Sequence, residues 1–72
     1  MNKAARQLVI INMLKHENGL SIRLIASHLG VSYMTVRRDV EELASRDEVR
    51  LIHGGVILSP RLVRGIEDRP YS

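Results

Sequence analysis

Apolar residues recur every three or four positions in three successive segments, and this spacing predicts three helices, over residues 3–16, 22–29 and 33–45. The recurring apolar positions are Leu8, Ile11 and Leu14, with Ala4 and Ile10 beside them, in the first segment; Ile22, Ile25, Ala26 and Leu29 in the second; and Val36, Val40 and Leu43 in the third. Each set occupies one side of a helix, so the three helices can share one core.

The residues between these segments are typical helix ends. Residues 17–19, Glu-Asn-Gly, end the first helix, with Asn or Gly available for a left-handed cap. Ser21 and Ser32 are suitable N-caps for the second and third helices. Gly30 can take the positive φ of a helix C-terminus, and Val31 can fill the corner. Two helices joined by a three-residue turn containing Gly indicate a helix-turn-helix.

The pattern changes after residue 47. Residues 48–52 (EVRLI) and 56–58 (VIL) favour β-strands, and residues 53–55 (HGG) favour a turn between them, so a hairpin is expected. Leu20 could pair with it as a third strand. We therefore predict a mainly α fold with a small β-hairpin, a winged helix-turn-helix of three helices plus wing, over residues 1–58.

Residues 59–72 (SPRLVRGIEDRPYS) have a different composition. They hold both prolines of the chain and five charged residues. We expect them to be a linker toward a C-terminal effector domain that is absent from this chain, and to be disordered in part or in whole.

The composition narrows the possible functions. The chain of 72 residues has no Cys, Trp or Phe, so it offers no disulfide or thiolate metal site and needs an aliphatic core. Aromatic residues are too few to bind single strands by base stacking. No nucleophile–base pair, phosphate-binding Gly loop or His–acid metal spacing occurs, so neither an enzyme nor a cofactor is expected. No apolar run suggests membrane insertion or a signal peptide, and a cytoplasmic location is expected.

The order of charges in the third helix is unusual. The net charge of +3 indicates only weakly an anionic partner. Within the helix, however, Arg37 and Arg38 come before Glu41 and Glu42, an order that opposes the helix macrodipole. One interpretation is a solvated face with ion pairs Arg37–Glu41 and Arg38–Glu42. The other is that the early turns carry arginines because those turns face DNA.

Helical geometry favours the second interpretation. With Val36 at the centre of the buried face, Met34 and Arg38 point directly away from the core, and Thr35 lies on one flank. Arginine can bond bidentately to guanine, and hydroxyl groups suit phosphates. Met34 could contact a thymine methyl group or cover the edge of the core. Asp39 is expected to be structural, holding an arginine or a backbone group.

The wing offers a second contact. His53 could touch a phosphate or the minor groove, or it could pack within the turn with its ring bonded to backbone. Gly54 and Gly55 suit the turn geometry and let the backbone approach DNA closely. The expected DNA-binding residues are Ser21, Ser32, Tyr33, Met34, Thr35, Arg37, Arg38, His53 and Gly54.

The motifs in residues 29–32 (LGVS), 35–40 (TVRRDV) and 53–56 (HGGV), with Leu43 between them, resemble the N-terminal DNA-binding domain of DeoR-type bacterial transcriptional regulators. That family usually has Gly where Asp47 stands, and Asp tolerates the same left-handed φ. The resemblance implies a sequence-specific, double-stranded operator as partner. It also implies a repressor role in sugar metabolism, and a phosphorylated sugar effector bound only by the absent domain.

Two other function classes are compatible with the fold. A winged-helix protein-interaction module would need an apolar or acidic outer face on the third helix, and Arg37 and Arg38 argue against it. A regulatory DNA-binding domain of an enzyme is the other alternative. With no heptad and no exposed apolar stripe expected, this chain should be a monomer, and the full-length regulator a homo-oligomer.

Overall fold

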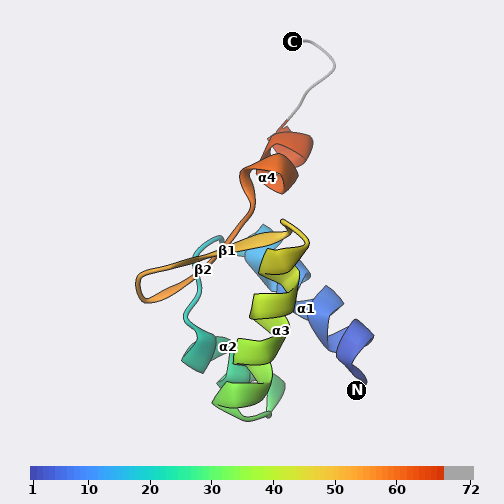
Figure 1. The fold of residues 1–72 in the computed structure, drawn as a ribbon, viewed down its shortest axis with the longest axis vertical. Helices are drawn as coiled ribbons and strands as arrows, with labels where there is room; N and C mark the ends of the chain where they lie inside the picture. The colour runs from blue at the N-terminus through green and yellow to red at the C-terminus, as the bar shows by residue number, and fades with distance from the viewer. Residues whose placement is uncertain (68–72) are drawn as a thin grey trace.

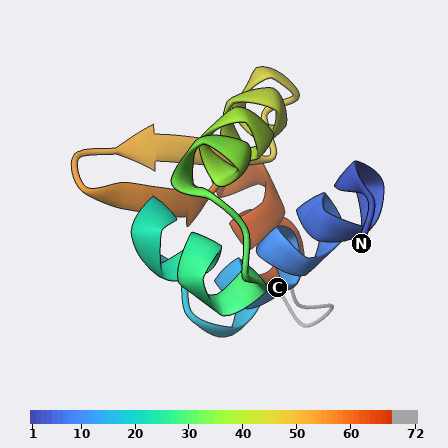
Figure 2. The same ribbon diagram turned by 90° about the horizontal axis from the view of Figure 1, so that it is seen from below.

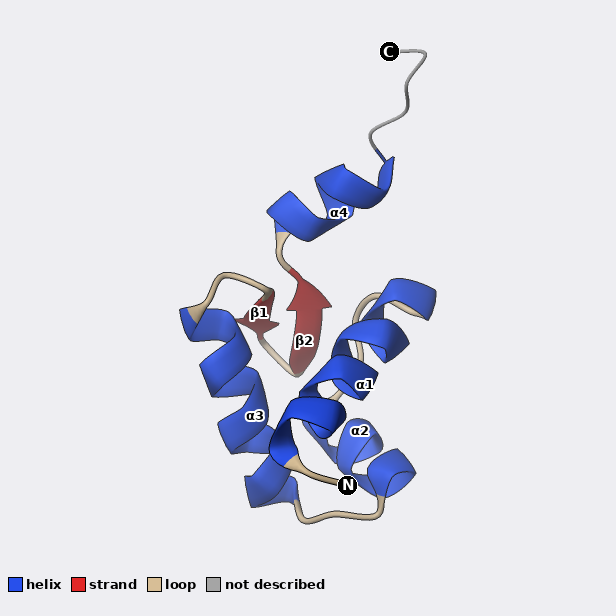
Figure 3. Cartoon of the chain, turned by 90° about the vertical axis from the view of Figure 1, so that its right-hand side faces the viewer, coloured by secondary structure: helices blue, strands red, loops and turns tan. Residues whose placement is uncertain are grey.

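The computed structural model describes residues 1–67, in which three helices pack together, a hairpin follows, and a fourth helix comes last (Figure 1). The elements are α1 (Lys3–His16), α2 (Ile22–Leu29), α3 (Tyr33–Ser45), β1 (Val49–Ile52), β2 (Gly55–Leu58) and α4 (Pro60–Glu67). Figure 3 shows α3 on one side of the molecule, α1 and α2 on the other, and α4 beyond the hairpin. The winged helix-turn-helix prediction is confirmed.

The helix ends follow from their capping residues. The Asn2, Ser21 and Ser32 side chains accept hydrogen bonds from the amides of residues 5, 24 and 35, at 2.8, 2.9 and 3.1 Å. Each bond satisfies an amide that has no partner inside its helix. Gly30 ends α2 in the left-handed conformation, with φ of 71°, as expected.

The wing is an antiparallel hairpin that carries a third short strand. The register pairs Val49 with Leu58, and Ile52 with Gly55. Leu20 bridges to Val56, with N–O distances of 3.0 and 2.8 Å between their backbones, as expected. Gly55 begins β2 instead of lying in the turn. A Cβ there would stand 2.9 Å from the Leu20 carbonyl oxygen, so Gly55 permits this close approach.

The core is entirely aliphatic, and every element from α1 to β2 contributes to it. The buried apolar residues are Ile10, Leu14, Leu20, Ile22, Ile25, Ala26, Val36, Val40, Leu43, Val49, Val56 and Leu58. Burial of this apolar surface is the main favourable contribution to folding.

The buried face of α1 differs from the prediction. Leu8 is 72% exposed, whereas Gln7 is only 7% exposed, next to the buried Ile10 and Leu14. The expected buried stripe therefore wrongly included Leu8. The Leu8 side chain lies on the surface, and Gln7 is buried instead. The reason is that the Gln7 side chain hydrogen-bonds Glu42 of α3 and the C-cap Arg46, so this polar residue faces inward with its hydrogen bonds satisfied.

Residues 60–67 form α4, so the segment 59–72, expected to be disordered in part or in whole, contains a helix. Ser59 is buried, and its hydroxyl oxygen accepts from the Arg61 amide at 3.4 Å. Pro60 occupies the first helical position, where its missing N–H costs nothing. Leu62 and Val63 pack against the core. Residues 68–72 lie outside the described residues.

Candidate nucleic-acid interface

The outer face of α3 carries the predicted contact residues. Met34 is 55% exposed, and Tyr33 and Arg38 are also exposed, whereas Val36 is completely buried. This confirms the directions expected from helical geometry. The hairpin projects beyond α2 and α3, so its tip and the outer face of α3 border the same side of the molecule (Figure 2).

The two arginines of α3 differ in their ion pairing. Arg37 Nε donates to Glu41 Oε2 at 2.9 Å. The pKa of Arg37 is raised, first by the hydrogen bond to Glu41 and then by that to the Tyr33 hydroxyl. The Arg38–Glu42 pair, one of the two interpretations of this charge order, does not form, because Glu42 contacts Lys3 and Gln7 of α1. Arg38 has no ion-pair partner among the described side chains.

A groove of about 360 Å³ separates the wing from the helix-turn-helix. Its lining residues are Ser21, Ile22, Arg23, Tyr33, Arg37, Leu51, Ile52, Gly54 and Gly55. The groove brings together four of the predicted contact residues: Ser21, Tyr33, Arg37 and Gly54. Guanidinium, phenol and hydroxyl groups along one groove are suited to contacts with phosphate oxygens.

The remaining predicted residues lie outside the groove lining. Ser32 and Thr35 stand at the start of α3, with their hydroxyl oxygens 2.9 Å apart. Met34 and Arg38 stand on its outer face. His53 is exposed at the hairpin tip, and its ring makes no hydrogen bond with the described side chains or backbone. Gly54 has φ of 84°, so its backbone geometry matches the expected turn role.

Five groove residues were not among the expected contact residues: Ile22, Arg23, Leu51, Ile52 and Gly55. Arg23 lies in the first turn of α2, two residues after the N-cap Ser21, and this position places it at the groove. Leu51 is exposed and also lines the groove. The signal for Arg23 was its place beside a helix N-terminus, the end of a helix that attracts phosphates.

The chain matches the family of DeoR-like helix-turn-helix domains over residues 6–61. It belongs to that family. It is 40% identical over 62 residues to an HTH-type transcriptional regulator of Haemophilus influenzae, covering 86% of this chain and 24% of that protein. It is 43% identical over 56 residues to the HTH-type transcriptional repressor CutR of Bacillus subtilis, and the match covers 78% of this chain and 30% of CutR. It is 36% identical over 52 residues to the L-fucose operon activator of Escherichia coli, and the match covers 72% of this chain and 21% of that protein.

This DeoR-like domain therefore spans between a fifth and a third of the length of those relatives. The relatives are transcriptional regulators, a class of protein distinct from enzymes. Among the described residues of the domain, no helix has the length and apolar character needed to cross a membrane.

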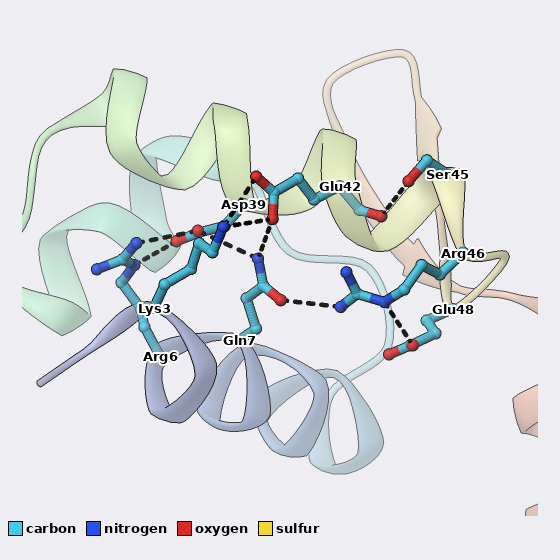
Figure 4. A network of polar contacts seen from close by, with 8 residues as sticks. All are labelled: Lys3, Arg6, Gln7, Asp39, Glu42, Ser45, Arg46 and Glu48. Carbon is cyan, nitrogen blue, oxygen red and sulfur yellow. Dashed lines mark hydrogen bonds and ion pairs between the residues drawn. The ribbon is translucent and has the colours of Figure 1, made fainter.

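A polar network joins the inner flank of α3 to α1 in the DeoR-like domain (Figure 4). Asp39 is 1% exposed, and its two carboxylate oxygens accept from Nε and Nη2 of Arg6. This confirms the structural role expected for Asp39. The pKa of Arg6 is raised, mainly by this hydrogen bond. Gln7 donates to Glu42 at 3.0 Å and accepts from Arg46 at 2.8 Å.

Proposed function

We propose that this DeoR-like domain binds a double-stranded operator sequence-specifically, as the DNA-binding part of a transcriptional repressor. The observation that carries the proposal is the surface formed by α3 and the wing, where Tyr33 and Arg37 line the groove and Arg38 is exposed on the outer face of α3. Positive side chains next to a projecting hairpin fit a duplex, which offers a groove to the helix and phosphates to the hairpin.

In this arrangement α3 enters the major groove by its N-terminal half. Arg38 points away from the core and has no ion pair with any side chain that the structure describes, so it can reach a base edge, where guanine is the preferred partner of arginine. Arg37 and Tyr33 contact a phosphate across the groove. Met34 lies beside Arg38, at a position suited to a thymine methyl group. Glu41 and Glu42 lie further along α3, away from the entering end.

The phosphate contacts surround this base contact. Ser32 and Thr35 place hydroxyl groups at the N-terminus of α3, and Ser21 does the same for α2, although each serine is also a helix cap. Helix N-termini favour anions because their amides are unpaired and their dipole end is positive. At the wing tip, the exposed His53 and the backbone of Gly54 contact a phosphate or the minor groove.

The regulated genes belong to sugar metabolism in this proposal. The L-fucose operon activator supports this, and CutR supports the repressor role. A phosphorylated sugar would act through a domain outside this chain, and that domain would also assemble the full-length regulator into a homo-oligomer. The domain itself needs no cofactor to bind DNA.

The proposal is tested by selecting duplexes from a random-sequence library with the wild-type chain. Arg38→Ala is expected to weaken binding to the selected duplex by about 1–3 kcal/mol and to relax base preference at one or two positions. Lys15→Ala removes an exposed base on α1, outside the groove, and serves as the matched control. Fluorescence anisotropy at fixed salt concentration measures the affinity of each variant for the selected duplex and for random duplex.

Two results would contradict the proposal. The first is a wild-type chain that enriches no sequence over random duplex, and this outcome would favour the protein-interaction module. The second is an equal loss for Arg38→Ala on selected and random duplexes, which would make Arg38 a phosphate contact only.

A further inference from the structure

The apolar contacts of α3 determine which face of the helix is buried, but they do not fix its direction by hydrogen bonds. Its buried side chains, Val36, Val40 and Leu43, make non-directional contacts with other aliphatic groups. The helix with its side chains has a radius of about 5–6 Å, so a rotation of about 20° moves a surface side chain by roughly 2 Å. A shift of that size breaks a hydrogen bond to a base edge, because donor–acceptor distances tolerate only a few tenths of an ångström.

The polar network supplies directional contacts that the core lacks. The residues that α1 contacts are Asp39 and Glu42 of α3 and its C-cap Arg46, spaced i, i+3 and i+7, so they lie on one side of the helix. The contacts come from Arg6 and Gln7 of α1, with Lys3 one turn earlier adding an ion pair to Glu42. Figure 4 shows them reaching α3 along two successive turns.

The strongest of these contacts stands next to the base-reading residue. Asp39 follows Arg38 directly and is buried, whereas Arg38 is exposed. Arg6 presents two N–H groups to the two oxygens of one carboxylate, a planar fork that fixes direction as well as distance. Gln7 adds a third donor to Asp39, 3.4 Å from Oδ1. The carboxylate is therefore held from two sides.

We propose that Arg6 is a positioning residue for DNA readout: its two-point contact with Asp39 fixes the rotation of α3 and thereby the direction of Arg38. This inference rests on the proposed DNA-binding function. Arg6 acts through α3 and touches no base, so its loss impairs the choice of sequence and leaves phosphate contacts intact.

Arg6→Lys tests this, because lysine keeps the charge and loses the fork. The wild-type-selected duplex is expected to bind about tenfold more weakly, as for the loss of one well-aligned base contact. Random duplex should bind within about twofold of wild type, because the number of phosphate contacts is unchanged. Asp39→Asn should behave in the same way, since an amide offers one acceptor oxygen where the carboxylate has two.

Ile10→Val is the matched control. It lies on the same helix, faces the core, and lowers thermal stability without touching the network. Ile10→Val should lower Tm but keep the wild-type ratio between the affinity for the selected duplex and the affinity for random duplex. The proposal is overturned if Arg6→Lys also keeps that ratio, whether its two affinities are unchanged or fall by the same factor.

A second measurement needs no DNA. Residual dipolar couplings of α3 amides, referenced to those of α2, report the orientation of α3 in the free chain. Arg6→Lys should change them and Ile10→Val should not, and unchanged couplings in Arg6→Lys overturn the proposal. A wild-type chain without sequence preference would refute the proposed function, while these couplings would still decide the role of Arg6.

Discussion

At the scale of single residues, Gly55 shows that a glycine in a turn motif can serve a different purpose. It belongs to β2, with no positive φ, and its hydrogen faces the Leu20 carbonyl. Gly54 is the residue that takes the positive φ, in open space. The two adjacent glycines are therefore required for different reasons: Gly55 for close packing against backbone, and Gly54 for its backbone conformation.

Gly55→Ala is expected to destabilise the fold by about 1–3 kcal/mol, because a methyl group 2.9 Å from a backbone oxygen forces the Leu20 bridge apart. Gly54→Asn is the control, since Asn tolerates positive φ and nothing obstructs it. Urea unfolding followed by circular dichroism gives both free energies of unfolding. Equal losses for the two variants would contradict the packing role of Gly55.

At the scale of elements, α3 depends on its neighbours for its polar partners. Its last turn contains no basic residue that could complement the negative end of its dipole. Arg61 of α4 supplies that charge, with Nη2 donating to the Arg46 carbonyl at 3.4 Å and Nε to the Asp47 carbonyl at 3.0 Å. At its inner flank, α1 supplies Gln7 and Lys3 to Glu42. The position of α3 is thus set from both α1 and α4.

The Glu42 contact makes stability depend on pH. The pKa of Glu42 is lowered, first by the Gln7 hydrogen bond and then by that from Lys3. A carboxyl with a lowered folded-state pKa stabilises above its ordinary pKa, about 4.5, and loses that contribution as pH falls through the lower value. Because Glu42 is partly exposed, solvent screens this contribution and we expect it to be small.

Glu42→Gln should therefore reduce the fall in Tm between neutral and acidic pH, since the variant has no carboxyl to protonate at this position. Ser45→Ala is the control, because it removes a side-chain hydrogen bond one turn away and no titrating group. Calorimetry over a pH series measures the slopes. A slope for Glu42→Gln equal to that of wild type would show that the contact with α1 does not form in solution.

At the scale of the whole molecule, exposed apolar side chains occur in separate places. Leu51 and Ile52 lie at the groove, whereas Leu8 lies on α1 between two shallow hollows that share Ile11. The surface around Leu8 is small compared with the area that a stable interface buries, about 800 Å² on each partner. A single exposed leucine is also common on monomeric proteins.

We accordingly expect the free 72-residue chain to sediment as a monomer at micromolar concentration. Leu8→Lys should leave its sedimentation coefficient unchanged. A dimer that dissociates in Leu8→Lys would contradict this expectation and assign an interface to α1. A single DeoR-like domain would then contact only a few base pairs, so under the proposed function its preference for a selected duplex is modest, and two copies on paired half-sites would increase it.

The sequence alone determined the local structure of this protein. The bounds of α1, α2 and α3, the serine caps, the left-handed Gly30 and the hairpin all depend on residues within one or two turns of each other. The outward direction of Arg38 also follows from helical geometry once Val36 is placed in the core. These features were predictable because neighbouring residues decide them.

Only the tertiary structure decided which side chains meet across the fold. Gln7 is buried in place of Leu8, and Glu42 pairs with α1 in place of Arg38, because partners more than 30 residues away satisfy their polar groups. The α4 helix forms where Ser59, bonded to Asp47, caps it and the core accepts its first turn. Sequence periodicity reports which residues share a face of one element, but partners on other elements determine whether a polar residue can lie inside.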